Sequence, residues 1–305
     1  MAYGDKLLEL AGDNKDIVAL DADLCNSTMS CVIEQNFPDR FFEMSIAEQN
    51  MVATAAGMAL KGKIPFVNTF AVFLTGRAFD QIRQSVAYPG LNVKLCGSSA
   101  GFSDFGDGAT HQTVEDIALM RALPNMTVLC PADEIETKAM VAFMAQYKGP
   151  VYLRLDRNDT PIILDDSYKF ELGKPTVITE GSDVTIFATG RMVSVALKAA
   201  ESLKANDGIT AKVVNIGTIK PLDTKMVQEL AKSTGAVVTV EEHNVYGGMG
   251  SAIAESLMTS KIPIVPVGVA DRFGQSAMTV EDLLVEYGLT DDAVAKAARE
   301  VISYK

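Results

Sequence analysis

The sequence predicts an α/β protein built from two doubly wound domains. Short apolar runs alternate with segments whose apolar residues recur at helical spacing, a pattern typical of a parallel sheet covered by helices. The chain has 305 residues, 48% of them hydrophobic, so it is long enough to bury more than one core. A polar stretch rich in proline and aspartate interrupts the alternation at 157–175, and the alternation then restarts. We therefore expect a domain at 1–165, a linker at 166–180 and a smaller domain at 181–305.

In the first domain, each expected strand is a short apolar run and each expected helix has apolar residues at helical spacing. The run "DIVALDADL" is rich in β-branched residues, and the first helix closes at a glycine, a common helix terminator. A loop rich in glycine, serine and aspartate follows the third strand. The expected elements are strands at 16–24, 64–70, 92–98, 127–132 and 150–156, and helices at 45–62, 77–87, 113–123 and 133–147.

The second domain repeats this alternation on a smaller scale. Its strands, such as "TAKVVNI" and "GAVVTVEEH", are rich in valine, and its helices begin soon after each strand. The expected strands lie at 183–190, 210–216, 235–243 and 263–270. The expected helices lie at 192–205, 224–233 and 250–260, with one more helix at the C-terminus.

Charge and cysteine content exclude several classes of function. With 39 acidic and 27 basic residues, the chain has a net charge of −12, which argues against nucleic acid or an anionic membrane surface as the main partner. The four cysteines form no CxxC pair, as expected for reduced thiols. No N-terminal segment is typical of a signal peptide, and no apolar run reaches the roughly 20 residues of a membrane span. These features predict a cytoplasmic protein.

Glu48 has two interpretations. In "SIAE", Ser45 and Glu48 have the spacing of a capping box, in which the serine caps a helix and the glutamate bonds back to it. Alternatively, Glu48 is a buried carboxylic acid that donates a hydrogen bond to a ring nitrogen of a ligand.

Four more residues lie where open α/β sheets bind ligands, after the carboxyl ends of predicted strands. His111 and Asp107 share a glycine-rich loop, where they could grip the hydroxyl groups of a polyol or could simply be turn residues. Phe70 and Phe73 bracket "FAVF", and they could form a flat wall for a heterocyclic ring or could pack in the core.

Several separated motifs resemble the pyrimidine-binding domain of transketolases: "ALDADLCNST", "MSIAEQNMVATAAGMAL", "NTFAVF", "DGATHQTVEDIALMRALPNM" and "CPADEIE". The second half resembles the transketolase C-terminal domain, which implies a mixed sheet there. The resemblance runs in order over nearly the whole chain. The chain begins at "MAYGDKLLEL", close to where the pyrimidine domain would start, so it resembles the C-terminal subunit of a split, two-chain transketolase.

This resemblance implies an enzyme of the pentose phosphate pathway that moves a two-carbon ketol unit from a ketose phosphate to an aldose phosphate. The cofactor would be thiamine diphosphate, with Mg²⁺ (or Ca²⁺) held by an N-terminal partner subunit in an α2β2 heterotetramer. The triplet Gly106–Gly108 looks like the start of the family's diphosphate motif. The asparagine which that motif requires downstream is absent from "CPADEIET", however, and "GDGATHQ" resembles the substrate loop instead. We therefore expect no metal ligand in this chain.

The resemblance also assigns roles around the cofactor. Glu48 would hydrogen-bond the aminopyrimidine ring and favour the imino tautomer, whose nitrogen removes the thiazolium C2 proton. Phe73 would stack on the pyrimidine, with Phe70 beside it. Asp23 and Leu24 match the family's "DL" turn at the thiazolium ring.

Other residues would bind the sugars. His111 would contact the hydroxyl and carbonyl oxygens of the donor, and Asp107 the C2 hydroxyl of the acceptor. Ser27 and Arg157 match residues that hold the sugar phosphate, and a guanidinium group suits a phosphate dianion.

The chain departs from the family pattern in places. Ser99 stands where the family has a substrate-binding histidine, and a phosphate-binding arginine just before "AYG" has no counterpart. Gly76 replaces an aromatic residue near the cofactor. A phosphorylated acceptor is expected, but a sugar with a different charge stays open. The alternatives are a fragment like deoxyxylulose phosphate synthase, a β subunit like that of 2-oxo-acid dehydrogenases, and a non-catalytic scaffold subunit.

Overall fold

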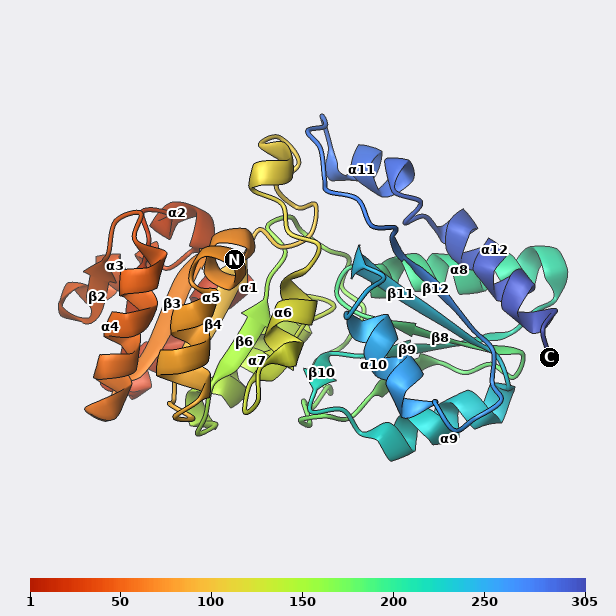
Figure 1. Ribbon diagram of the computed structural model, residues 1–305, viewed down its shortest axis with the longest axis horizontal. Helices are drawn as coiled ribbons and strands as arrows, with labels where there is room; N and C mark the ends of the chain where they lie inside the picture. Colours follow the sequence, from red (N-terminus) through yellow and green to blue (C-terminus); the bar gives the residue numbers. More distant parts are fainter.

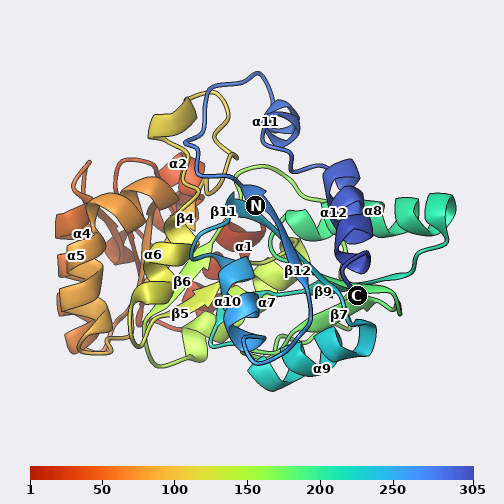
Figure 2. The ribbon, with the colours of Figure 1, turned by 45° about the vertical axis from the view of Figure 1, so that its right-hand side comes forward.

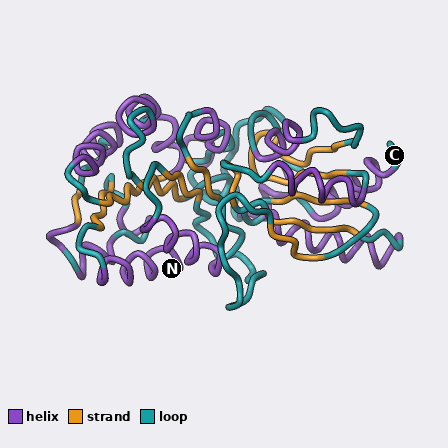
Figure 3. Tube along the Cα trace, turned by 90° about the horizontal axis from the view of Figure 1, so that it is seen from below, coloured by secondary structure: helices purple, strands orange, loops and turns teal.

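Two sheets, each covered by helices, lie side by side in the computed structural model, which describes all residues from 1 to 305 (Figure 1). The first sheet has seven strands in the order β10-β5-β6-β4-β3-β1-β2, and the second has five in the order β12-β11-β8-β9-β7. Seen from below, helices lie on both sides of the strands in both halves (Figure 3). The predicted fold class, two α/β domains of which the second has a mixed sheet, is confirmed.

Six strands of the first sheet run parallel, and β10 lies antiparallel at its edge next to β5. All residues of β1, β4 and β6 are buried, because helices cover both faces, and this explains the continuous apolar runs in the sequence. The strands are β1 (Ile17–Asp21), β2 (Phe41–Glu43), β3 (Ile64–Phe70), β4 (Lys94–Ser98), β5 (Thr127–Leu129), β6 (Val151–Arg154) and β10 (Thr218–Lys220).

Three helices of this domain, α1, α2 and α3, are not predicted by the sequence analysis. Helix α1 buries Tyr3, Leu7 and Ala11, which are spaced by four residues. The helices are α1 (Ala2–Asp13), α2 (Cys25–Thr28), α3 (Cys31–Asn36), α4 (Glu48–Leu60), α5 (Phe79–Gln81), α6 (Asp116–Ala122) and α7 (Glu134–Gln146). Two π-helical turns, η2 (Phe73–Arg77) and η3 (Ile82–Ala87), flank α5, and short 3₁₀ turns are η1 (Pro38–Arg40) and η4 (Gly108–Thr110).

The capping-box interpretation of "SIAE" is wrong. Ser45 has φ 57°, a left-handed backbone conformation, and it precedes the N-cap residue Ala47 by two positions. Its backbone N–H donates to Glu43 Oε1 at 2.7 Å instead of taking part in the helix start. Helix α4 therefore begins at Glu48, and no side chain caps it. The Glu48 carboxylate is free for another role.

The second sheet has four parallel strands and an antiparallel edge strand, β7. β7 lies inside 166–180, the range predicted as a linker. Helices α8 and α9 each end at a glycine with positive φ, Gly208 and Gly235. The elements are β7 (Thr176–Thr179), β8 (Val184–Ala188), α8 (Met192–Asp207), β9 (Ala211–Asn215), α9 (Thr224–Thr234), β11 (Val237–Asn244), α10 (Met249–Ser256), β12 (Ile264–Val269), α11 (Val280–Glu286) and α12 (Asp291–Ile302).

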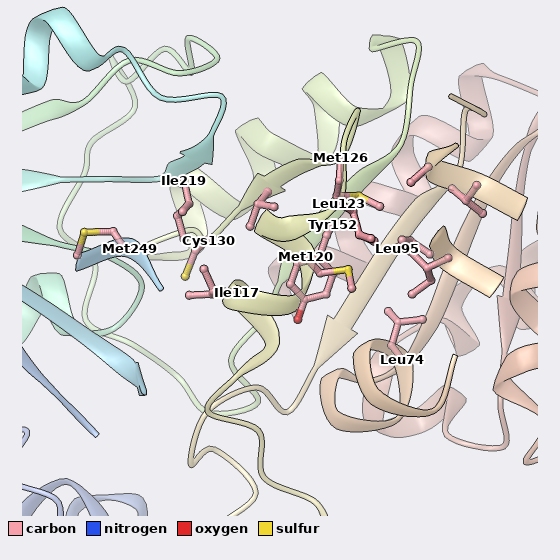
Figure 4. Close-up of a cluster of buried hydrophobic side chains, with 14 of the residues drawn as sticks. Leu74, Leu95, Ile117, Met120, Leu123, Met126, Cys130, Tyr152, Ile219 and Met249 are labelled. Carbon is pink, nitrogen blue, oxygen red and sulfur yellow. The ribbon is translucent and has the colours of Figure 1, made fainter. Parts of the chain in front are cut away.

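The two domains share one buried cluster. Ile219 of β10 and Met249 of α10 belong to the second half of the chain, yet they lie in the same cluster as Ile117, Cys130 and Tyr152 of the first half (Figure 4). Because β10 also extends the first sheet, both backbone pairing and apolar packing join the domains. All four cysteines are free thiols, as expected. None of the helices has the combination of length and apolar composition that crossing a membrane requires.

Candidate functional site

Apart from Glu48, which follows β2, the predicted site residues come from four segments at or after the ends of parallel strands of the first sheet. The carboxyl ends of β1, β3, β4 and β6 lie at one edge of the sheet, and the segments after them meet there. The loop after β4, residues 99–112, is called the site loop below. The segments contribute Asp23, Leu24 and Ser27 after β1, Phe70 and Phe73 at the end of β3, Ser99, Asp107 and His111 in the site loop, and Arg157 after β6.

The structure brings two phenylalanines and a histidine together. The rings of Phe70 and Phe73 are nearly parallel, with centroids 6.1 Å apart and planes 13° from each other. The His111 ring lies edge-on to both, with its centroid 5.3 Å from that of Phe73 and 6.3 Å from that of Phe70. Phe73 is only partly buried, so this aromatic corner is open on one side. A flat ligand can lie against it, with an imidazole at its rim.

Glu48 lies next to this corner. Its side chain is 1% exposed, and its two carboxylate oxygens each accept a hydrogen bond of 2.8 Å from Arg77 Nη1. The Arg77 guanidinium carbon also lies 4.8 Å from the centroid of the Phe73 ring. In this state Arg77 covers both the buried acid and the aromatic face beside it. The sequence analysis does not predict Arg77, although an arginine so close to the "FAVF" aromatics is a signal that could have been used.

Charged groups surround His111 on the side of the site loop. Arg157 Nη1 donates to Asp104 Oδ2 at 3.1 Å, and its guanidinium carbon lies 5.9 Å from the Phe70 centroid. Burial raises the pKa of Asp104, Arg157 opposes this shift, and the negative charge of Asp107 adds to it. Asp107 itself is exposed, and His111 Nδ1 lies 2.9 Å from the Thr110 hydroxyl. This part of the site offers several groups that can bind hydroxyl groups.

Ser27 and Arg157 line one cavity of about 450 Å³. The first residues of the chain, together with Asp156 and Asn158, form other parts of its wall. The two predicted phosphate-binding residues are therefore close to each other. Arg157 is exposed and is the only cationic side chain of this lining, and it is paired with Asp104, whereas four carboxylates, of Asp133, Glu134, Asp156 and Asp159, also line the cavity.

The turn that carries Asp23 and Leu24 is fixed by an acid that the sequence analysis does not single out. Asp21, the last residue of β1, accepts a hydrogen bond of 2.7 Å from the Leu24 backbone N–H and two more from the hydroxyls of Thr28 and Ser30. Burial raises its pKa to about 6, although these bonds oppose the shift. Asp23 has φ 62°, an unusual conformation that this bonding holds.

Ser99 and Gly76 do not contribute side chains to this surface. Ser99 has φ 53° and is fully buried, and its hydroxyl has no hydrogen-bond partner. It therefore cannot reach a substrate from this position, so a substrate-binding role for it is not supported. Gly76 is exposed, and a Cβ at that position would meet no atom within 4 Å.

Comparison with known proteins agrees on both halves of the chain. Residues 1–162 match the family described as "Transketolase, pyrimidine binding domain", and residues 173–294 match "Transketolase, C-terminal domain". A putative transketolase C-terminal section from Methanocaldococcus jannaschii is 45% identical, over 98% of this chain and 94% of that protein. A subunit of 6-deoxy-6-sulfo-D-fructose transketolase from Clostridium sp. is 44% identical, over 99% of this chain and 94% of its own length. A solved structure described as a split gene transketolase, inactive β4 tetramer, superposes with a TM-score of 0.92 at 49% identity, covering 100% of this chain and 98% of that one.

Proposed function

Because this chain belongs to the transketolase family, we propose that it is the C-terminal subunit of a split transketolase that depends on thiamine diphosphate. It would transfer a two-carbon ketol unit from a ketose phosphate to an aldose phosphate. The observation that supports this most strongly is the convergence of Glu48, the Phe70–Phe73 pair and His111 at one edge of the sheet. These groups come from three separate segments of the chain.

The residues present fit the aminopyrimidine half of the cofactor. A flat heterocycle needs an apolar wall and a partner for its ring nitrogen, and Phe73 and the buried Glu48 carboxyl group lie side by side. For the diphosphate half, the triplet Gly106–Gly108 is not followed by the asparagine that the family's diphosphate motif requires. We therefore assign the diphosphate and the Mg²⁺ to an N-terminal partner subunit.

Thiamine diphosphate supplies, when bound, an electron sink for cleaving and forming the carbon–carbon bond next to a carbonyl group. The task of Glu48 would be to hold a proton at the ring nitrogen, for which its carboxyl group must be released from Arg77. Phe73 and Phe70 would fix the ring plane and exclude water from it. Asp23 and Leu24 would bound the site at the turn after β1.

The sugars would bind to the side chains around the site loop. His111 would hydrogen-bond donor oxygens and move a proton between them, since imidazole can donate or accept near neutral pH. Asp107 would accept a hydrogen bond from an acceptor hydroxyl group. Ser27 and Arg157 would hold the anionic end of the sugar in the cavity that they line.

Two anionic groups are candidates for that end of the sugar. A phosphate is the first, because a guanidinium fork suits a dianion. A sulfonate is the second, because the Clostridium relative is a subunit of a 6-deoxy-6-sulfo-D-fructose transketolase. Comparison of kcat/KM for sugars with either group would decide between the two.

Activity would require the partner. The solved relative described as a β4 tetramer is also described as inactive, which supports a requirement for a second subunit. An α2β2 assembly would give each aromatic corner one diphosphate site. We expect the purified chain alone to show no ketol transfer, and turnover by this chain without any partner would refute the proposal.

The test is to co-express the chain with an N-terminal transketolase subunit from the same genome. Ketol transfer from xylulose 5-phosphate to ribose 5-phosphate would be measured with thiamine diphosphate and Mg²⁺. Glu48→Gln keeps the shape of the side chain and should abolish activity, whereas Gln49→Ala changes the exposed neighbour and should not. Use of pyruvate as the donor, with loss of CO₂, would favour the synthase-like or dehydrogenase-like alternatives instead.

A further inference from the structure

A segment of the second domain lies on the site loop. This segment, Asp271–Met278, connects β12 to α11 and is called the strap below. In two views it runs beside η4, the short turn of the site loop (Figures 1 and 2). The cofactor-facing residues Glu48 and Phe73 belong to other segments, so the strap touches the sugar side of the proposed site.

Hydrogen bonds connect the strap to the site loop at two places, Phe105 and Gln112. The backbone N–H of Ala277 donates to the Phe105 carbonyl at 2.9 Å. The Gln112 side-chain nitrogen donates to the Gln275 carbonyl at 3.0 Å and to the Asp104 carbonyl at 3.1 Å. Gln112 is buried and directly follows His111, so these bonds fix the backbone next to the imidazole.

Two glycines allow this close approach. A Cβ on Gly274 would overlap Gln112 Oε1, and a Cβ on Gly108 would lie 2.5 Å from Ser276 Oγ. Gly108 also has φ 78°, which favours glycine in any case, whereas Gly274 has no such backbone restriction. A side chain at position 274 would therefore displace the Gln112 carboxamide, and the local backbone conformation alone does not demand glycine there.

The strap and the inner part of the loop are held by the body of the second domain. Tyr287, just after α11, donates its hydroxyl group to the Phe273 carbonyl at 2.7 Å. Its ring also lies against that of Phe102 in the site loop, with centroids 4.4 Å apart. In addition, Glu242 Oε1 of β11 accepts the Phe102 backbone N–H at 3.1 Å. The second domain thus contacts the loop at Phe102, Phe105, Gly108 and Gln112.

We infer that the second domain positions the sugar site: contacts from the strap to the site loop fix the positions of His111 and Asp107. This inference rests on the proposed function, which gives those two residues their contact with the sugar. Gln112 and Gly274 act as positioning residues, because they reach the substrate only through the loop. Substitutions at the strap are expected to change sugar binding and to leave cofactor binding unchanged.

The experiment uses the complex with the partner subunit and compares Gly274→Ala with Gly12→Ala. A Cβ on Gly12 would meet no atom within 4 Å, so this variant controls for replacing glycine. Gly274→Ala should raise KM for both sugars about 10-fold or more, since small displacements of positioned groups are costly, with a much smaller change in kcat. The Kd for thiamine diphosphate should stay within about 2-fold, and amide hydrogen exchange should rise in peptides from 99–112.

A second variant guards against misfolding and tests the mechanism. Gln112→Ala removes atoms instead of adding them, and it should raise KM in the same way by releasing the loop. It also makes room for the new methyl group, so Gly274→Ala should add little to KM in the Gln112→Ala background. Additive effects of the two substitutions would overturn the proposed contact.

The outcomes separate the inference from the proposed function. An active wild-type complex whose Gly274→Ala and Gln112→Ala variants keep the wild-type KM would overturn the inference alone. The inference would also fail if cofactor affinity fell together with sugar affinity, because the strap would then act on overall folding. A wild-type complex without any ketol transfer would instead refute the proposed function.

Discussion

Arg77→Gln is expected to have two effects of opposite sign. In the free chain, Arg77 is the partner of a carboxylate that is 1% exposed, so its loss should lower stability. In the proposed complex, that same contact would have to break before Glu48 could bond a pyrimidine nitrogen. Removing Arg77 should therefore make thiamine diphosphate bind more tightly.

The magnitude follows from the exposure of the two side chains. Hydrogen bonds to charged groups contribute about 1.5–3 kcal/mol, and the Arg77 side chain is 46% exposed, so solvent screening reduces this contribution. We expect a loss of about 2 kcal/mol in the free energy of unfolding of the free chain. This corresponds to a decrease in Tm of about 3 °C for a chain of 305 residues. By linkage, the Kd of the complex for the cofactor should fall by up to about 30-fold.

Two measurements check this prediction. Calorimetric melting of the free chain gives Tm, and titration calorimetry of the complex gives the Kd for thiamine diphosphate. Arg83→Ala, which changes another exposed arginine in the neighbouring turn η3, is the control and should alter neither value. A variant whose cofactor affinity falls along with its stability would refute the reasoning, because Arg77 would then assist binding instead of competing with it.

Three further predictions concern other parts of the molecule. Burial raises the pKa of Glu242 from 4.5 to about 7, so between these pH values the folded chain keeps a proton on Glu242 that the unfolded chain loses. As the pH rises from 4.5 to 7, the free energy of unfolding should therefore fall by up to about 1.4 kcal/mol per pH unit. Urea unfolding across this range should show that Glu242→Gln removes this component. Arg157→Ala should raise KM for a phosphorylated sugar about 10- to 100-fold, with Arg157→Lys in between and the unphosphorylated sugar unaffected, as steady-state kinetics can show. Met249→Ala should lower the free energy of unfolding by about 2–5 kcal/mol. Urea should still unfold this variant in a single transition, because both domains share the cluster around Met249, and two transitions would contradict that shared core.

Local patterns predicted the elements of the fold where burial is uniform. The predicted strand 64–70 coincides with β3, because every residue from 65 to 70 is buried and the run is bounded by charged residues or helices. The pattern does not predict β10, which has only three residues and pairs with β5 across the two domains. Its pairing depends on where the second domain docks, and no spacing rule contains that information.

In the candidate site, too, some residues could be predicted from the sequence and others could not. The resemblance to transketolase motifs predicted Glu48, Phe70, Phe73, Asp107 and His111 as site residues, and the structure places their segments at one edge of the first sheet. Their supports could not be found in this way. An exposed arginine in a helical segment, such as Arg77, usually faces solvent, and its contact with the buried acid depends on the π-helical geometry of η2.

The contacts by which the second domain supports the site loop are even harder to predict from the sequence. Gln112 and Gln275 are 163 positions apart, and although Gln112 lies in the motif "GDGATHQ", nothing in that motif indicates its contact with the second domain. Only the folded chain reveals that a Cβ at position 274 would meet the side chain of Gln112. The failed capping-box interpretation has a related cause, since the left-handed Ser45 reflects a bond to Glu43 and not the helix that follows.

The place of β10 also bears on how such chains can recombine. A hybrid that joins the first 165 residues of one relative to the second domain of another would have to match a foreign β10 to β5 and a foreign Ile219 to the cluster around Cys130. A fragment cut in the linker would leave β5 as a bare sheet edge, which invites pairing with other chains and aggregation. The two domains are therefore expected to be inherited as one unit, and any natural break in this gene family should fall outside them.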